Sequence, residues 1–474
     1  MVIGYKMENW FSNEKNFIFK KKYTVYEFMG LSTDEKPEEW DEEPLVNGCS
    51  FFEIDTKELY YWNGKSWGGQ AEIYAYKDGD TLVITYDKEI TKHKDTYTIP
   101  EEVTQASDWG WYAERDNFKT IKINKNVKNY DGFKNMKYMF YSFRNILNFD
   151  GFENLNTSNV VNMANMFNDC GNTSQDLNSV PNVSTWDTSK VEDISYMFCG
   201  FGYGSSVINC VPDVSNWNTE KITNYKDVFA AYGFKSTNFN SVPDVSSWNT
   251  ENAIRLDGLF YNYGAGSEVL DKVPNVSNWD THKTKNINSI FFSYGYNSKA
   301  LNAVPDVSKW NTYEVEDMGQ VFYDYGYKSE ILSVTPDVLN WDTRNVDTMA
   351  GMFREYGGSS KLVELPKVYN FKMNKVTNME YMFQRYGAGK GYGSFRLFNV
   401  PNAVNNYQKM LEGVKLTSIT ITPRYSVADW VQAGLTNSKG DVEATWYTEN
   451  GEKFEKCALP HDLTVLTTYY DYTH

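Results

Sequence analysis

The chain of 474 residues is predicted to fold as an α/β solenoid, leucine-rich-repeat-like, in which each coil of 31 residues holds a short strand and a short helix. Three series of residues with the same step support this prediction: a tryptophan, a phenylalanine and a glycine. The phenylalanine series runs from Phe167 to Phe353 and the glycine series from Gly171 to Gly357. The tryptophans are Trp186, Trp217, Trp248, Trp279, Trp310 and Trp341.

The helix is predicted from the residues that follow an Asp/Asn-Thr pair. In one coil, Val191, Ile194, Met197 and Phe198 recur at the spacing of a single helical face. The Asp-Thr pair supplies an oxygen for the N-cap, and Gly202 stands where a left-handed residue ends a helix. Such a short helix needs cover for its apolar side, which stacked coils provide.

The strand is predicted from VPDVSNW, the other half of the repeat. Val211, Val214 and Trp217 are the apolar positions of one copy, and the segment reads as a short extended strand. The tryptophans are interpreted as core rather than as a ligand platform, because large residues stacked in register fill the interior of repeat proteins. Strands about 4.8 Å apart would give a rod on the order of 40 Å long.

Four regions are predicted along the chain. A terminal coil exposes its apolar side, so the repeats need a cap at each end. Strand-like runs at both ends supply these caps: AEIYAY, TLVITYD, TYTIP and KTIKIN before the repeats, and SITITP, VEATWYT and DLTVLTTYYDY after them. The regions are an N-terminal β-hairpin module at 1–70, a β-rich cap at 71–130, about eight to nine coils at 131–400, and a C-terminal β-rich cap or module at 401–474.

The repeat pattern W-[ND]-T-x-x-V-x-x-M-x-x-M-F resembles the BspA-like surface-protein repeat, the DUF285 family. The nearest copies are NTSNVVNMANMF, from Asn156 to Phe167, and DTSKVEDISYMF, from Asp187 to Phe198. The resemblance covers roughly residues 120–400 and departs from the usual form by an added loop in each coil. It implies a leucine-rich-repeat-like solenoid that binds at a surface, and it supplies neither a ligand nor catalytic residues.

The N-terminal segment NGCSFFEIDTKELYYWNGKSW, from Asn47 to Trp67, is predicted to form a β-hairpin with Asn63-Gly64 in a tight turn and with Phe51, Ile54 and Leu59 on one side. The segment resembles a small module of tailed-bacteriophage virion proteins. That resemblance implies attachment to a particle, and an ordinary hairpin is the alternative. The candidate attachment residues are Phe51, Ile54, Tyr60, Trp62 and Trp67.

Composition excludes several function classes. The net charge of −16 repels phosphate backbones, so no nucleic-acid partner is expected. No apolar run is long enough to span a bilayer, and the first residues do not form a secretory signal, so neither membrane insertion nor signal-directed export is expected. Scattered cysteines and histidines without ligand spacing predict no metal site, no cofactor and no enzyme.

Two sets of surface residues are candidates for binding. Aromatic residues just after the glycine are replaced by small residues in other coils, so they either bind ligand or pack against the neighbouring loop. They are Tyr203, Phe234, Tyr296 and Tyr327. A column of Asp and Asn could bind calcium, although neighbouring serines favour hydrogen bonding at the bend. It comprises Asn182, Asp213, Asp244, Asn275, Asp306 and Asp337.

These observations predict a non-enzymatic structural or adhesive protein of a tailed-phage virion: a fibre, decoration or receptor-binding element. Its expected partners are other virion proteins at the N-terminal region, a host surface glycan or protein, and further copies of itself. It would be made in the host cytoplasm and released by lysis. The alternatives are a bacterial BspA-like cell-surface adhesin and, third, a polysaccharide-degrading enzyme.

Overall fold

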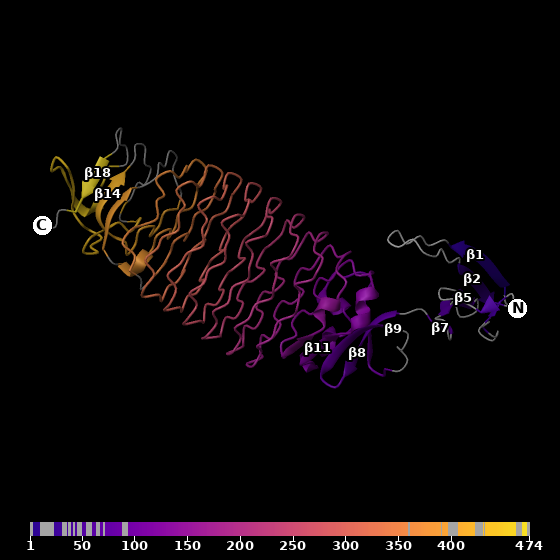
Figure 1. The fold of residues 1–474 in the computed structure, drawn as a ribbon. Helices are drawn as coiled ribbons and strands as arrows, with labels where there is room; N and C mark the ends of the chain where they lie inside the picture. Colours follow the sequence, from indigo (N-terminus) through magenta and orange to yellow (C-terminus); the bar gives the residue numbers. More distant parts are fainter. Residues whose placement is uncertain are drawn as a thin grey trace, which may run out of the picture.

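In the computed structural model, the repeats form a row of coils that lie side by side between two sheets, with the chain termini at opposite ends (Figure 1). The N-terminal sheet of the row contains β8 and β11, and the C-terminal sheet contains β14 and β18. The structure describes residues 3–9, 23–30, 36, 39–40, 43–44, 50–53, 59–62, 67–69, 72–87, 93–358, 361–389, 391–396, 406–421, 430, 432–460 and 467–471.

The predicted α/β solenoid of strand-plus-helix coils is wrong. Within the described ranges the regular elements are mostly strands in open mixed sheets, and helix is limited to short 3-10 segments. Neither the predicted helix nor the predicted VPDVSNW strand forms in the described repeats. Each coil instead has one parallel bridge position, and the series of bridges runs from Asn135 through Asn162 and Asp193 to Asn406.

The apolar spacing that suggested a helix arises from consecutive turns. The amide of Met197 donates to the carbonyl of Ile194 in its own coil at 3.1 Å, whereas the amide of Phe198 donates to the carbonyl of Val228 in the next coil at 2.9 Å. Amides therefore alternate between their own coil and its neighbour. An α-helix needs every amide to bond four residues back, so this alternation replaces the helix and still keeps the apolar residues inside.

Left-handed residues make the turns possible. Tyr196, Gly200 and Gly202 have φ values of 58°, 65° and 62°, and the same positions recur in the following coils. The third position is always glycine, because a Cβ on Gly202 would lie 2.6 Å from Cδ1 of Ile208 in the core. The glycine series therefore marks a tight turn packed on the core rather than the end of a helix.

The interior is built from stacked aromatic columns. The six tryptophans are 2–4% exposed, and neighbouring rings from Trp217 to Trp341 stack with centroids 6.1–6.4 Å apart. Each indole N–H donates to a carbonyl of the preceding coil, as Trp279 does to Val245 at 3.0 Å. Phenylalanines one step apart also stack, with Phe198 and Phe229 5.6 Å apart. The structure thus places the tryptophans in the core.

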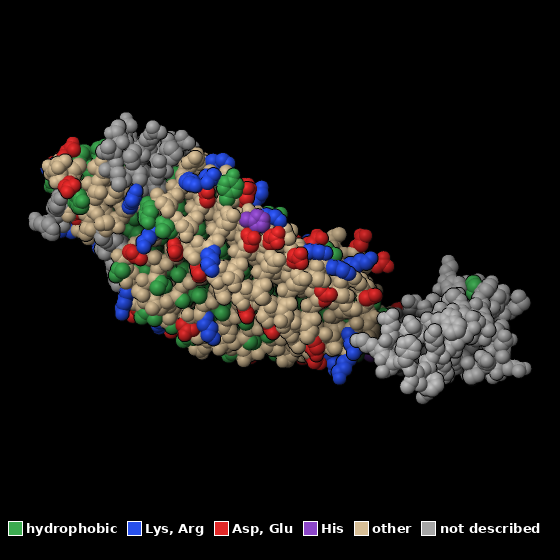
Figure 2. All heavy atoms as spheres, turned by 45° about the horizontal axis from the view of Figure 1, so that its top comes forward, with side chains coloured by type: hydrophobic (Ala, Val, Ile, Leu, Met, Phe, Trp, Pro, Cys, Tyr) green, Lys and Arg blue, Asp and Glu red, His purple; other side chains and the backbone are tan. Residues whose placement is uncertain are grey.

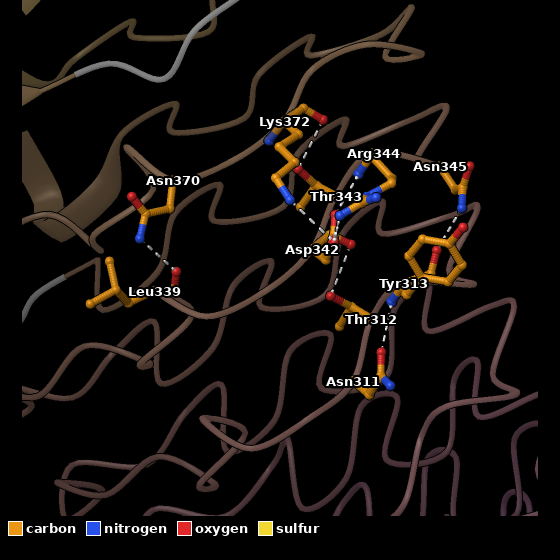
Figure 3. Close-up of polar contacts among 10 residues, drawn as sticks. All are labelled: Asn311, Thr312, Tyr313, Leu339, Asp342, Thr343, Arg344, Asn345, Asn370 and Lys372. Carbon is orange, nitrogen blue, oxygen red and sulfur yellow. Dashed lines mark hydrogen bonds and ion pairs between the residues drawn. The ribbon is translucent and has the colours of Figure 1, made fainter.

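A ladder of threonine hydrogen bonds holds the coils together at the corner two residues after each tryptophan (Figure 3). We call this part of the surface the threonine corner. The buried hydroxyl of Thr312 donates to the carbonyl of Asp342 in the next coil at 3.1 Å, and Thr343 donates in the same way to Lys372. This bond explains why threonine recurs beside each tryptophan. The other donors of the ladder are Thr188, Thr219, Thr250 and Thr281.

The N-terminal cap is the sheet β10-β8-β9-β11-β12, and it confirms the four strands predicted there. Trp109 and Trp111 donate their indole N–H groups to the carbonyls of Lys137 and Met139, which ties the cap to the first coil. The strands are β8 (Glu72–Asp78), β9 (Thr81–Asp87), β10 (Thr96–Thr98), β11 (Thr120–Ile123) and β12 (Asn148–Asp150). The 3-10 segments are η2 (Ala106–Asp108), η3 (Tyr112–Asn117), η4 (Lys125–Asn129) and η5 (Phe152–Asn154).

The C-terminal cap is the sheet β13-β14-β18-β16-β17, with β15 paired to β14. The predicted strands SITITP, VEATWYT and DLTVLTTYYDY correspond to β14, β16 and β18. The strands are β13 (Gly391–Arg396), β14 (Lys415–Ile421), β15 (Thr436–Asn437), β16 (Trp446–Thr448), β17 (Lys453–Phe454) and β18 (Thr467–Tyr470). The 3-10 segments are η6 (Tyr386–Gly389) and η7 (Glu455–Cys457).

The N-terminal residues form a third sheet, β1-β2-β5-β6-β7, with a separate β3–β4 hairpin. β5 and β6 are antiparallel, as predicted, and the register pairs Leu59 with Phe52 and Tyr60 with Phe51, which corrects the grouping of Leu59 with Phe51. Asn63 and Gly64 lie outside the described residues. The strands are β1 (Ile3–Asn9), β2 (Tyr23–Gly30), β3 (Glu39–Trp40), β4 (Glu43–Pro44), β5 (Ser50–Glu53), β6 (Leu59–Trp62) and β7 (Trp67–Gly69).

Candidate functional site

The consecutive turns present one surface of the stack to solvent. In one coil the side chain of Tyr325 is fully buried, whereas those of Tyr323, Asp324 and Tyr327 are half-buried. We define the turn face as the surface formed by these three positions and by their equivalents in the other coils. Because side chains there do not fill the core, their identity is free to vary, which is where a ligand-binding surface is expected.

The predicted binding aromatics lie on the turn face as two stacked pairs. Tyr203 and Phe234 have ring centroids 4.7 Å apart and planes 2° apart, and Tyr296 and Tyr327 have centroids 4.9 Å apart and planes 12° apart. A Cβ on Gly358 would lie 2.5 Å from the ring of Tyr327, so that ring also lies against the backbone of the next coil. Within each pair, one face of each ring is therefore covered by the partner ring.

A second aromatic row on the turn face was missed by the sequence analysis. Tyr261 stacks on Phe292 with centroids 4.7 Å apart, and Phe292 stacks on Tyr323 at 4.6 Å. The guanidinium of Arg354 continues this row, 5.0 Å from the ring of Tyr323 and 4.9 Å from that of Tyr381. Each ring of the row directly follows a residue of the phenylalanine series. That step of 31 residues was the signal that could have revealed it.

A charged cluster accompanies these rows. Burial raises the pKa of Asp324 to about 7, and the neighbouring Glu355 carboxylate adds to the rise, while Arg354 and Arg385 oppose it. Glu355 Oε1 lies 3.5 Å from Arg385 Nη1 and 3.9 Å from Arg354 Nη2. We call these four residues the Asp324 cluster. Groups with strongly shifted pKa values on a surface that the core does not require mark a candidate site.

A second charged cluster lies beside the turn face, on positions that come a few residues earlier in the coil, and it is neutralised internally. Arg255 donates to both carboxylate oxygens of Asp257, at 2.9 and 2.7 Å, and Lys226 Nζ lies 3.6 Å from Asp257 Oδ2. Burial raises the pKa of the adjacent Asp227 to about 6. Because its arginine is bound at both oxygens, this cluster leaves little hydrogen-bonding capacity for a ligand.

The raised pKa of Asp324 predicts a pH-dependent stability effect. The folded protein binds the proton more tightly than the unfolded chain, so Asp324 reduces stability as the pH rises from its ordinary pKa near 4 to about 7, and the full penalty remains above that value. Asp324→Asn should therefore raise the free energy of unfolding by about 1–2 kcal/mol near pH 8, after allowance for solvent screening, and change it little near pH 4.

Urea unfolding of both proteins at the two pH values measures this difference. Asp337→Asn is a matched control. Its carboxylate lies on the exposed bend and accepts a bond from the amide of Leu339 at 3.1 Å. An equal gain in both variants near pH 8 would contradict the assignment of the effect to burial of Asp324.

The side chains of the Asp/Asn column accept hydrogen bonds within the bends of the coils. The Asp244 Oδ1 atom accepts hydrogen bonds from the hydroxyl of Ser246 at 2.6 Å and from its amide at 3.0 Å, and these bonds lower the pKa of Asp244. Equivalent bonds occur at Asp213 and Asp306. In the part of the chain that the structure describes, no group of three or more His, Cys, Asp or Glu side chains is arranged to hold a metal ion.

The candidate attachment residues are only partly described. Phe51 in β5 is buried, and Lys36 Nζ lies 5.2 Å from the centre of its ring. Tyr60 and Trp62 are in β6 and Trp67 is in β7, where Trp62 pairs with Trp67. Ile54 lies outside the described residues. The structure therefore gives these residues a sheet position without identifying a binding surface.

The corner that carries the threonine ladder is polar and internally bonded (Figure 3). Asp342 accepts two bonds from Arg344, at 3.0 and 2.6 Å, and lies 3.3 Å from Lys372 Nζ. Nearby is an open hollow of about 360 Å³, in which Lys375 donates to Asn345 at 2.8 Å. Its lining residues are Glu314, Glu316, Asn345, Asp347 and Lys375.

The surface charge does not single out one large binding area. On the face shown in Figure 2, acidic and basic side chains are interspersed along the stack. The turn face is distinguished by its chemistry instead, because it combines tyrosine hydroxyls, aromatic edges and two guanidinium groups around Asp324 and Glu355. Such an arrangement can bind a hydroxyl-rich or charged ligand through hydrogen bonds.

Comparison with known proteins gives one family. The model of a family described as "Mycoplasma protein of unknown function, DUF285" matches residues 114–203, 179–291, 267–354 and 296–422. These overlapping matches extend over nearly two thirds of the 474 residues. No curated protein and no solved structure matches the chain. Among the described residues, no helix has the length and apolarity required to cross a membrane.

Proposed function

We propose that this chain, which belongs to the DUF285 family, is a non-enzymatic surface protein that binds a host glycan or protein through its turn face. The observation that supports this proposal is the set of aromatic and charged side chains on that face. These side chains recur along the stack, but Ala265 and Gly358 stand at the equivalent positions of other coils. The core therefore does not require an aromatic residue there. A repeat protein commonly uses such an extended surface for binding.

A non-catalytic role suits the geometry of the Asp324 cluster. Its carboxylates lie on an outward-facing row of side chains, whereas catalysis requires groups that surround a reacting atom and exclude water. The repeated ring stacking is also rigid, which favours recognition of a partner at low entropic cost. The charge of −16 supports the expectation that the partner is not a nucleic acid.

We propose two locations for this binding protein. Membership of DUF285, whose repeats resemble those of BspA-like surface proteins, favours display on a cell surface. The resemblance of Asn47–Trp67 to a phage virion module favours a fibre, decoration or receptor-binding element of a particle, with other virion proteins bound at the N-terminal sheet. Mass spectrometry of purified particles and of host envelopes separates these locations, and light scattering measures the homo-oligomer expected in either case.

Removal of two tyrosines from the turn face should weaken binding. In Tyr296→Ala/Tyr327→Ala, one stacked pair and its hydroxyls are lost. Because aromatic anchors carry much of an interface's energy, the amount of labelled protein bound to host cells should fall about tenfold or more. Flow cytometry of host cells incubated with each protein measures the change.

The control is Tyr313→Ala, which removes an exposed tyrosine from the threonine corner (Figure 3). It should bind as the unchanged protein does. Equal binding by the double variant and the unchanged protein, with both folded by circular dichroism, would show that the turn face is not the binding surface.

A further inference from the structure

We propose that the Asp324 cluster is a subsite for the anionic groups of an acidic polysaccharide. This inference rests on the proposed function, because it names the ligand chemistry of the turn face. The shared chemistry is a carboxylate or phosphate group repeated along a sugar polymer or a related polyol chain. The net charge of −16 opposes any polyanion over most of the surface, so the attraction is confined to the two guanidinium groups of the cluster.

The first argument is that the cluster has unused cationic donors. Arg354 and Arg385 share one carboxylate, Glu355, at distances of 3.9 and 3.5 Å. Charge-assisted hydrogen bonds are shorter, about 2.7–2.9 Å, so these contacts leave most guanidinium N–H groups available. The side chains of Arg354 and Arg385 are 29% and 58% exposed, so a ligand can reach the outer ends of both guanidinium groups. A ligand carboxylate or phosphate can accept from both guanidinium groups in bidentate fashion.

The second cluster, beside the turn face, shows the contrasting case. There Arg255 is bound to both oxygens of Asp257 at ordinary hydrogen-bond distances. The same residue types are therefore paired closely in the second cluster and loosely in the Asp324 cluster. This difference assigns the anion subsite to the Asp324 cluster alone.

The third argument comes from the orientation of the rings. Stacked rings cover their negative faces and turn their positive edges toward solvent, and an edge favours an anion. Phe292 is covered by Tyr261 and Tyr323, and Tyr323 is covered by Phe292 and Arg354, so these two rings offer no free face for sugar stacking or for a cationic ligand.

Hydrogen bonds to ligand hydroxyls complete the subsite. Burial raises the pKa values of Tyr296 and Tyr323, and the charge of Asp324 adds to the rise, so their hydroxyls stay protonated and can donate hydrogen bonds. Among the residues that the structure describes, the Asp324 carboxyl forms no hydrogen bond. The aromatic row extends along several coils from Tyr261 to Arg354, so an extended polymer can contact more of it than a small anion can.

Affinity for a polyanion should depend on pH through Asp324. The titratable and charged groups that interact electrostatically with its carboxyl are Glu355, Arg354, Arg385, Tyr296 and Tyr323. Protonation of Asp324 below about pH 7 removes a negative charge beside the two arginines and supplies an O–H donor. Binding should therefore strengthen as the pH falls from about 8 to about 6, and added salt should weaken it at either pH.

The test measures binding of the full chain to three soluble polymers by biolayer interferometry at low salt. Oligogalacturonate carries carboxylates, poly(glycerol phosphate) carries phosphates, and dextran is neutral. Arg385→Gln should weaken binding of the charged polymer about tenfold, because a hydrogen bond to a charged group is lost. Arg344→Gln is the matched control, since it removes the same charge from the threonine corner and should change affinity less than about twofold. Glu355→Gln should strengthen binding, and Asp324→Asn should remove its pH dependence.

Arg385-dependent binding of oligogalacturonate or of poly(glycerol phosphate) supports the inference, and the polymer that binds identifies the anionic group. Equal affinity for dextran, or equal effects of the two arginine variants, overturns it. If host-cell binding still requires Tyr296 and Tyr327 while neither charged polymer binds, only this inference fails and the proposed function stands. If the tyrosine variant also binds host cells normally, both fail.

Discussion

Trp279→Ala is expected to lower the free energy of unfolding by about 3–5 kcal/mol, the range for loss of a large buried aromatic residue. Trp279 is 3% exposed and stacks between Trp248 and Trp310, with centroids 6.2 Å away on each side. The variant loses the burial of the ring, leaves a cavity between two other rings, and leaves the carbonyl of Val245 without its indole donor. Urea unfolding followed by circular dichroism measures the loss.

Tyr313→Ala provides the comparison, because its side chain is 43% exposed at the edge of the coils. A surface truncation of this kind should cost less than about 1 kcal/mol. Coils contact mainly their neighbours, so the tryptophan variant should also broaden the transition by uncoupling the coils on either side. Similar losses in the two variants would mean that the tryptophan column is not the structural core.

The sequence determined the register of the repeats more securely than their local conformation. A step of 31 residues between tryptophans requires equivalent environments, and the stacked rings from Trp217 to Trp341 have them. The spacing of Val191, Ile194 and Phe198, however, fits two conformations. A short helix and a run of left-handed turns both bury residues at such intervals. They differ in the carbonyl to which each backbone amide donates its hydrogen bond.

Hydrogen bonds to the next coil decide between these conformations. The amide of Phe198 bonds to Val228, which is 30 residues ahead, and no local pattern encodes such a bond. The sequence also did not predict the positive φ of residues other than glycine, such as Tyr196 and Asp227. These residue types rarely adopt positive φ, so nothing in their identity indicates it. Tertiary contacts therefore overrode a helix preference that was reasonable for one coil alone.

The candidate site was only partly accessible to sequence reasoning. Tyr296 and Tyr327 were found because they follow the glycine and vary between coils. Asp324, Glu355 and Arg385 form a column of their own, but their importance depends on burial and mutual distance rather than on spacing. The stacking of the rings on one another, which changes the ligand chemistry that they favour, also required coordinates.

Gly264→Ala should lower the free energy of unfolding by about 2–5 kcal/mol, because two effects add together. The residue has φ of 55°, so a side chain incurs roughly 1–2 kcal/mol of left-handed strain. A Cβ there would lie 2.9 Å from Cδ2 of Leu270 and 3.1 Å from the ring of Phe239, both of them buried. Overpacking of this kind adds about 1–3 kcal/mol.

Gly200→Ala separates the two effects, because this glycine also has a positive φ of 65° but lies at the outward left-handed position. Its new Cβ would meet Oδ1 of Asp169, the end of a flexible side chain. The next coil already carries Ala231 at the same position, with φ of 54°. Gly200→Ala should therefore show only the strain, roughly 1–2 kcal/mol in urea unfolding. If both variants lost the same amount, the invariant glycine column would reflect backbone strain alone, and the packing of Gly264 against the core would not be the reason for its recurrence.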